Sequence, residues 1–165
     1  MSKPYDWSKF TEKIAVKGVT PKQMYDWWIT GDNLEKWFLR RADYYRDGKV
    51  ISKSESCKAG DSYEWEWFGY DVIEEGKVLE ANGKDLFKFT FANGCTVTVK
   101  FEPFKDYTII TLTQENIPLT EEAKVSTHLG CSQGWQFYLC NIKSIAEGGI
   151  DIRNKDSEVR GVINS

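Results

Sequence analysis

Apolar and polar residues alternate with a period of two from about residue 42 to residue 114. Four runs carry this pattern: 63–67, 87–91, 97–101 and 110–113. Turn-forming dipeptides such as Asn82-Gly83 and Asn93-Gly94 separate them. Clean alternation is typical of an antiparallel sheet with one face on the core and one face in water. We expect about six strands, strongly twisted and therefore curled into a curved sheet.

The N-terminal part of the chain predicts one more strand and two short helices. Alternation near 9–17 indicates the strand. Thr20, Pro21 and Gln23 form a capping box with proline at the first helical position, which predicts a helix over 21–29 that ends at Gly31. A second cap at Asp32 opens a helix that runs through residue 37.

Helical spacing takes over from residue 120 to residue 147. Thr120 is the expected cap, and Gly148-Gly149 is the expected stop. Apolar residues from Cys131 to Ile145 recur at intervals of three or four, which makes one continuous stripe. A lone long helix must bury such a stripe, and the inner face of the sheet is the large apolar surface available. The sequence therefore predicts an α+β fold in which a curved sheet grips this helix on its concave face.

Composition narrows the class of protein further. The chain has 165 residues, a net charge of -3 and 41% hydrophobic residues, which fits a single domain over 1–165 with no dedicated nucleic-acid binding. No apolar run approaches the ~20 residues of a membrane span. The N-terminus has no apolar region typical of an export signal, so we expect a cytoplasmic protein. The four cysteines are widely spaced, which indicates reduced thiols and predicts neither a metal site nor a cofactor.

Two local patterns have the residue types of catalytic sites. Residues 130–134 match the G-x-S-x-G pattern, but Ser132 falls inside a helical segment and the chain's one histidine, His128, precedes it. His128 and Cys131 are three apart and can share one helix face. We interpret both patterns as helix packing, because activation of a nucleophile needs a base, an orienting group and the right geometry. We expect no catalytic residues.

The aromatic residues are the most informative set. Seven tryptophans are many for this length, and rigid rings with few polar neighbours line pockets for apolar ligands. Strand and helix phase direct these rings toward one interior, either as a solid core or around a cavity. The candidate cavity-lining residues are Trp37, Tyr63, Trp65, Trp67, Phe89, Phe91, Val99, Leu112, His128, Cys131, Trp135 and Leu139. A bound apolar molecule would be oriented by one polar contact from His128 or Tyr63.

Several segments resemble one known family. Residues 33–38 resemble its L-x-x-W-F segment, and Gly134-Trp135 with residues 149–153 is the strongest match. The chain is similar over roughly residues 8–153 to the family related to the C-terminal domain of the Hsp90 ATPase activator, within the START-like, Bet v 1-like (SRPBCC) superfamily. The resemblance implies one START-like domain with the helix-grip fold, a folded core at 8–153 and a polar tail at 154–165.

Three functions are compatible with these observations. The first is a non-catalytic domain that binds a small apolar molecule between the sheet and the C-terminal helix, as the resemblance implies for superfamily relatives. The second is a protein-interaction module, whose partner by resemblance is an Hsp90-type chaperone. The third is an enzyme of the cyclase or hydrolase kind that uses His128 with a carboxylate.

Overall fold

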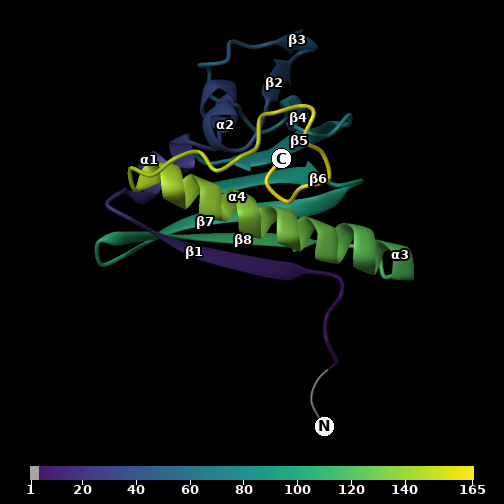
Figure 1. Ribbon diagram of the computed structural model, residues 1–165. Coiled ribbons are helices and arrows are strands. Elements are labelled where there is room, and N and C mark those ends of the chain that lie inside the picture. The colour runs from purple at the N-terminus through teal and green to yellow at the C-terminus, as the bar shows by residue number, and fades with distance from the viewer. Residues whose placement is uncertain (1–3) are drawn as a thin grey trace.

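The computed structural model describes residues 4–165 (Figure 1). Its elements follow in the order β1 (Phe10–Lys17), α1 (Pro21–Asp26), α2 (Gly31–Trp37), β2 (Arg41–Arg46), β3 (Lys49–Val50), β4 (Ser62–Glu66), β5 (Ile73–Ala81), β6 (Leu86–Phe91), β7 (Cys95–Phe104), β8 (Tyr107–Glu115), α3 (Glu121–Ala123), η1 (Lys124–Leu129) and α4 (Gly130–Ala146). The predicted α+β class is confirmed. A sheet and a long C-terminal helix form the two main layers.

Within residues 4–165, eight antiparallel strands form one sheet in the order β1-β8-β7-β6-β5-β4-β2-β3. The sequence indicated about six. One of the two additional strands is β3, which has two residues, too few to show any period, and only pairs with the end of β2. Every pairing between neighbouring strands is antiparallel, as the alternation predicted.

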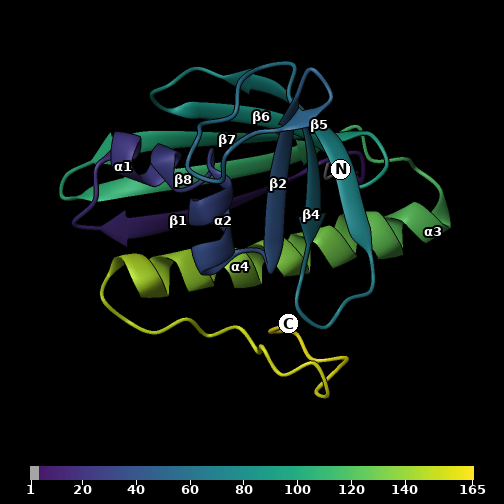
Figure 2. The ribbon, with the colours of Figure 1, turned by 90° about the horizontal axis from the view of Figure 1, so that it is seen from above.

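The sheet bends sharply at β5. The first half of β5 pairs with β4 and the second half pairs with β6, with a register shift between Val78 and Glu80. A bulge of this kind bends the strand and increases its twist. Figure 2 shows the result, with β2 and β4 running across the direction of β1, β7 and β8. The inner face of this curved sheet holds the core.

Both short helices start at threonine caps. Thr20 and Gln23 form the predicted capping box at α1, which ends at Asp26 rather than at residue 29. The cap of α2 is Thr30, whose side chain accepts a hydrogen bond from Asn33, so the predicted cap at Asp32 is wrong. Gly31 begins α2 instead of ending α1. A Cβ atom there would lie 2.5 Å from the carbonyl oxygen of Ala42, so only glycine fits.

The predicted long helix spans α3, η1 and α4. Thr120 caps it and α4 ends at Ala146, close to the expected bounds. The segment η1 is π-helical, a wider winding that apolar periodicity does not show. Helix α4 lies along the inner face of the sheet (Figure 1). Lys143 of α4 donates a hydrogen bond to the carbonyl oxygen of Ala15 in β1. Trp135, also on α4, is buried.

The C-terminal residues return along α4 toward α2 and the β4–β5 loop (Figure 2). Arg153 is buried, and its guanidinium group donates hydrogen bonds to the carbonyl oxygens of Glu35 and Leu39, 3.0 Å from each. These carbonyl groups lie at the C-terminal end of α2, where helical carbonyls have no partner within the helix. Asp151 pairs with Arg153 and accepts a hydrogen bond of 3.1 Å from the side-chain amide of Asn141 in α4, so both residues hold this segment to the rest of the protein.

Candidate functional site

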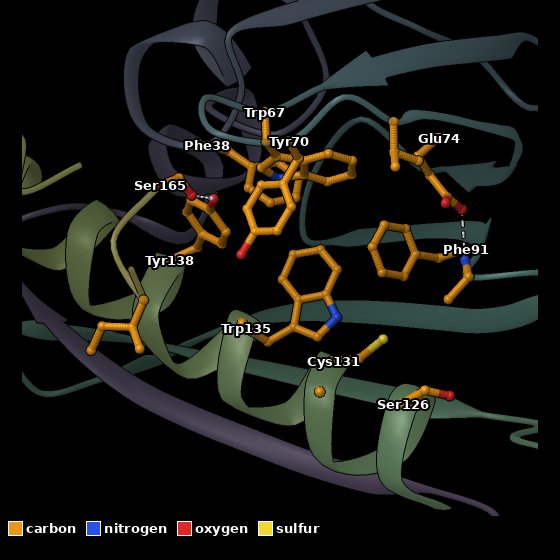
Figure 3. Close-up of a pocket in the computed structure, with 15 residues that line it drawn as sticks. Phe38, Trp67, Tyr70, Glu74, Phe91, Ser126, Cys131, Trp135, Tyr138 and Ser165 are labelled. Carbon is orange, nitrogen blue, oxygen red and sulfur yellow. Dashed lines mark hydrogen bonds between the residues drawn. The ribbon is translucent and has the colours of Figure 1, made fainter. Parts of the chain in front are cut away.

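A cavity of about 440 Å³ lies between the start of α4, the β4–β5 loop, the end of β6 and the C-terminal residues (Figure 3). We call it the aromatic pocket. Six rings line it: Phe38, Trp67, Tyr70, Phe91, Trp135 and Tyr138. The other lining residues are Val72, Glu74, Ala92, Ser126, Gly130, Cys131, Gly134, Ile163 and Ser165. The volume is within the range of small-molecule sites, roughly 300–1,000 Å³.

Trp135 is the central ring of the pocket. Its ring centroid lies 5.1 Å from that of Phe38 and 5.2 Å from that of Phe91, and Trp67 is 6.2 Å from Phe91. The indole N–H of Trp135 donates a hydrogen bond of 3.0 Å to the side-chain oxygen of Gln114 in β8. Figure 3 shows these rings facing a common space. Because each ring packs on its neighbours, the walls of the pocket are preformed.

The helical side of the pocket leaves open space at two positions that have no side chain. Gly130 and Gly134 both line the pocket on α4. A Cβ atom at Gly134 would meet nothing within 4 Å, and one at Gly130 would meet only the carbonyl oxygen of Val125, at 3.7 Å. Cys131 lies between them, and burial raises the pKa of its thiol to about 11. The thiol therefore stays protonated at neutral pH and is a weak nucleophile.

The rim of the pocket is apolar and exposed. Tyr70 and Val72 on the β4–β5 loop are more than half exposed, and Ile163 is 89% exposed. Ser165 is buried beside them, where its main-chain oxygen accepts a hydrogen bond from the hydroxyl group of Tyr138. The C-terminal residues thus form one wall of the pocket.

Glu74 is the one acidic residue among the lining residues, and none of them is Lys, Arg or His. Figure 3 places it beside Phe91, at one end of the pocket. One carboxylate oxygen accepts a 2.6 Å hydrogen bond from the backbone N–H of Ala92. Burial raises the pKa of Glu74, and this single hydrogen bond only partly opposes the effect.

The structure brings four of the candidate residues to the pocket: Trp67, Phe91, Cys131 and Trp135. The others do not line it and are buried in the solid core or beside it: Trp37, Tyr63, Trp65, Phe89, Val99, Leu112, His128 and Leu139. Their inward direction follows from strand and helix phase, but neighbouring rings fill the space around them. Tyr63 and Trp65, for example, stack with ring centroids 3.9 Å apart.

His128 lies outside the pocket, so its predicted polar contact with a ligand has no geometric support. One ring nitrogen is 2.8 Å from the hydroxyl group of Tyr5, and the other is 3.0 Å from the carbonyl oxygen of Trp7. The hydroxyl group predicted as the alternative contact, that of Tyr63, instead donates to the carbonyl oxygen of Thr90. His128 holds the N-terminal segment, and neither of these two hydrogen-bond contacts is with a carboxylate.

Ser132, the central residue of the G-x-S-x-G pattern, sits in α4 and donates a hydrogen bond to Glu12 of β1. It therefore joins the helix to the sheet. The two glycines of the pattern face the aromatic pocket and no neighbouring backbone packs closely against them, so the interpretation as close helix packing is wrong for them.

Sequence reasoning missed most of the lining residues. Phe38 belongs to the L-x-x-W-F segment, and Gly130 and Gly134 belong to the G-x-S-x-G pattern, so signals existed for these three. Tyr70 and Ile163 come from segments without periodicity, and nothing in the sequence brings them together.

Among residues 4–165, no group of three or more His, Cys, Asp or Glu side chains is arranged to hold a metal ion. No helix in this part of the chain is both long and apolar enough to cross a membrane.

The family model described as Activator of Hsp90 ATPase homolog 1-like protein matches residues 18–147. The chain belongs to this family. The match covers every element from α1 to α4, including the part of α4 that lines the aromatic pocket. No curated protein matches the chain.

Solved structures share the helix-grip fold of this family member. The protein SSP2350 from Staphylococcus saprophyticus has a TM-score of 0.69 and 19% identity, over 88% of this chain and 96% of that one. The Aha1 dimer from Colwellia psychrerythraea has a TM-score of 0.65 and 18% identity, over 86% and 97%. An HSP90 activator from Plasmodium falciparum has a TM-score of 0.61 and 21% identity, over 84% and 95%. At these identities the likeness shows the fold alone.

Proposed function

We propose that this family member is a non-catalytic domain that binds a small, flat, apolar molecule in the aromatic pocket. The observation that carries the proposal is a preformed cavity of about 440 Å³ with six rings in its walls and two glycines at its helical side. Apolar cavities with a few polar groups are the usual form of small-molecule sites. The pocket opens beside the core and leaves the core packing intact.

The expected affinity is modest. Ligands of ten to fourteen non-hydrogen atoms gain roughly 0.3–0.5 kcal/mol per atom at sites of ordinary quality. A two-ring molecule would then bind with about 3–7 kcal/mol, which corresponds to a Kd between roughly 10 micromolar and several millimolar. Naphthalene derivatives match the shape set by Trp135, Phe91 and Trp67, and their binding changes the emission of tryptophans in the wall.

The test uses a fluorescent naphthalene-type probe and a variant that fills the pocket. Gly134→Leu places a side chain where a Cβ atom would meet nothing within 4 Å. It should abolish probe binding and the quenching of tryptophan emission. Gln133→Leu is the matched control, because Gln133 is exposed on the same helix and does not line the pocket.

The Gln133→Leu protein should bind the probe as the wild-type protein does. The proposal fails if the wild-type protein does not bind the probe, or if the Gly134→Leu and Gln133→Leu proteins bind it equally well. Circular dichroism of both variants checks that the fold is retained.

The alternative function is a protein-interaction module for an Hsp90-type chaperone. Its support is the family's description and the exposed apolar side chains near the pocket, including Val125 and Leu129 on η1. Exposed apolar patches of this kind mark protein contact sites. Addition of the protein to a purified Hsp90 should raise the ATPase rate if this function holds, and Val125→Asp should remove the effect. An unchanged ATPase rate would count against it.

A further inference from the structure

The aromatic pocket carries negative charge and no positive charge among its lining residues. Glu74 is its only acidic lining residue, and no basic lining residue balances it. Arg160 in the C-terminal segment pairs with Asp71 of the β4–β5 loop, with a nitrogen–oxygen distance of 2.6 Å. Among residues 4–165, no Lys, Arg or His forms an ion pair with Glu74, and its one hydrogen bond comes from the backbone of Ala92.

The rings next to Glu74 suit a positive charge as well. Phe91 precedes Ala92, the residue that binds the carboxylate, and it lies between Glu74 and Trp135 in Figure 3. Trp67 and Trp135 each pack on Phe91. The faces of such rings carry negative electrostatic potential and attract cations. A carboxylate and several aromatic rings therefore adjoin the same space.

We propose that the aromatic pocket selects a flat apolar molecule that carries an ammonium group, with that group at Glu74. This inference rests on the proposed function and names the class of its ligand. A cation at this place replaces water around a half-buried carboxylate and adds cation–π attraction. A carboxylate ligand meets only repulsion there, because the lining residues offer no positive partner.

Three probes with the same ring system test the inference: 1-naphthylmethylamine, 1-naphthalenemethanol and 1-naphthoic acid. Isothermal titration calorimetry near neutral pH compares a cation, a neutral molecule and an anion of nearly equal size. The ammonium probe should bind about tenfold more tightly than the alcohol. The carboxylate probe should bind more weakly than the alcohol.

Two single variants locate the charge effect. Glu74→Gln keeps the shape and the acceptor for the Ala92 N–H, and it should remove the preference for the ammonium probe over the alcohol. Glu75→Gln is the matched control. Glu75 is the next residue of β5, points to the opposite face of the sheet and lines a separate polar hollow with Glu64 and Lys77. Its loss removes the same net charge and should leave the preference intact.

The outcomes separate the two proposals. If no probe binds the wild-type protein, the proposed function fails, and this inference fails with it. If the alcohol binds as tightly as the ammonium probe, or if the preference survives in Glu74→Gln, the ligand class is wrong while the pocket still binds apolar molecules. An equal loss of preference in Glu74→Gln and Glu75→Gln would show a net-charge effect and would also overturn the inference.

Discussion

Trp135 joins the core to the aromatic pocket, and its replacement by alanine tests this arrangement. The side chain is 2% exposed and packs on several rings, among them Phe38 and Phe91. Loss of a buried tryptophan ring costs about 3–5 kcal/mol of unfolding free energy. The change also leaves the side-chain oxygen of Gln114 without its partner, so a penalty of about 1 kcal/mol is added.

The pocket next to Trp135 moderates this cost, because water can enter the space that the ring leaves. We therefore expect Trp135→Ala to lower the unfolding free energy by about 4 kcal/mol. Trp135→Phe keeps most of the ring packing and loses only the hydrogen bond, so it should cost about 1–2 kcal/mol. Urea titration followed by far-ultraviolet circular dichroism measures the unfolding free energy of both variants. A loss below about 1 kcal/mol for alanine, or equal losses for the two variants, would refute the reasoning.

Two further predictions follow from the polar groups. Burial alone would raise the pKa of Asp151, but hydrogen bonds from Arg153 and Lys155 outweigh it and hold that pKa well below its usual range. The unfolding free energy should therefore fall as pH drops below about 4, toward the pKa of folded Asp151. This fall should be smaller in the Arg153→Met variant. Identical urea midpoints for the wild-type protein from about pH 6 to about pH 3 would contradict the prediction. Iodoacetamide should modify exposed Cys140 first, as mass spectrometry of digests can show, and equal rates at Cys131 would argue against a buried, protonated thiol.

The sequence predicted the sheet and the long helix because their residues obey simple periods. Alternation alone places Thr96, Thr98 and Thr113 on the solvent-facing side of the sheet. Helical spacing alone places Trp135 and Leu139 on the buried side of the helix. Elements without a period were missed. Strand β3 has two residues, and the π-helical winding of η1 changes no residue type.

The position of the pocket could not be predicted, because period shows which way a side chain points and not how deep it lies. Trp65 and Trp67 share one phase, yet Trp65 is enclosed by Tyr63 and Phe89 while Trp67 lies past the end of β4 and lines the pocket. The outer wall also needs Ile163 from the C-terminal residues, which reach it only through the contacts of the folded chain.

The central claim is that an apolar molecule binds in the aromatic pocket, and the position of a bound probe tests it most directly. Nuclear Overhauser effects between the ring protons of a naphthalene probe and protein side chains report that position. The account predicts contacts to the indole protons of Trp67 and Trp135 and to the ring of Phe91, with none to Trp28, which is fully buried in the core. Contacts that lie only on the outer face of the sheet, near Glu75, would contradict it.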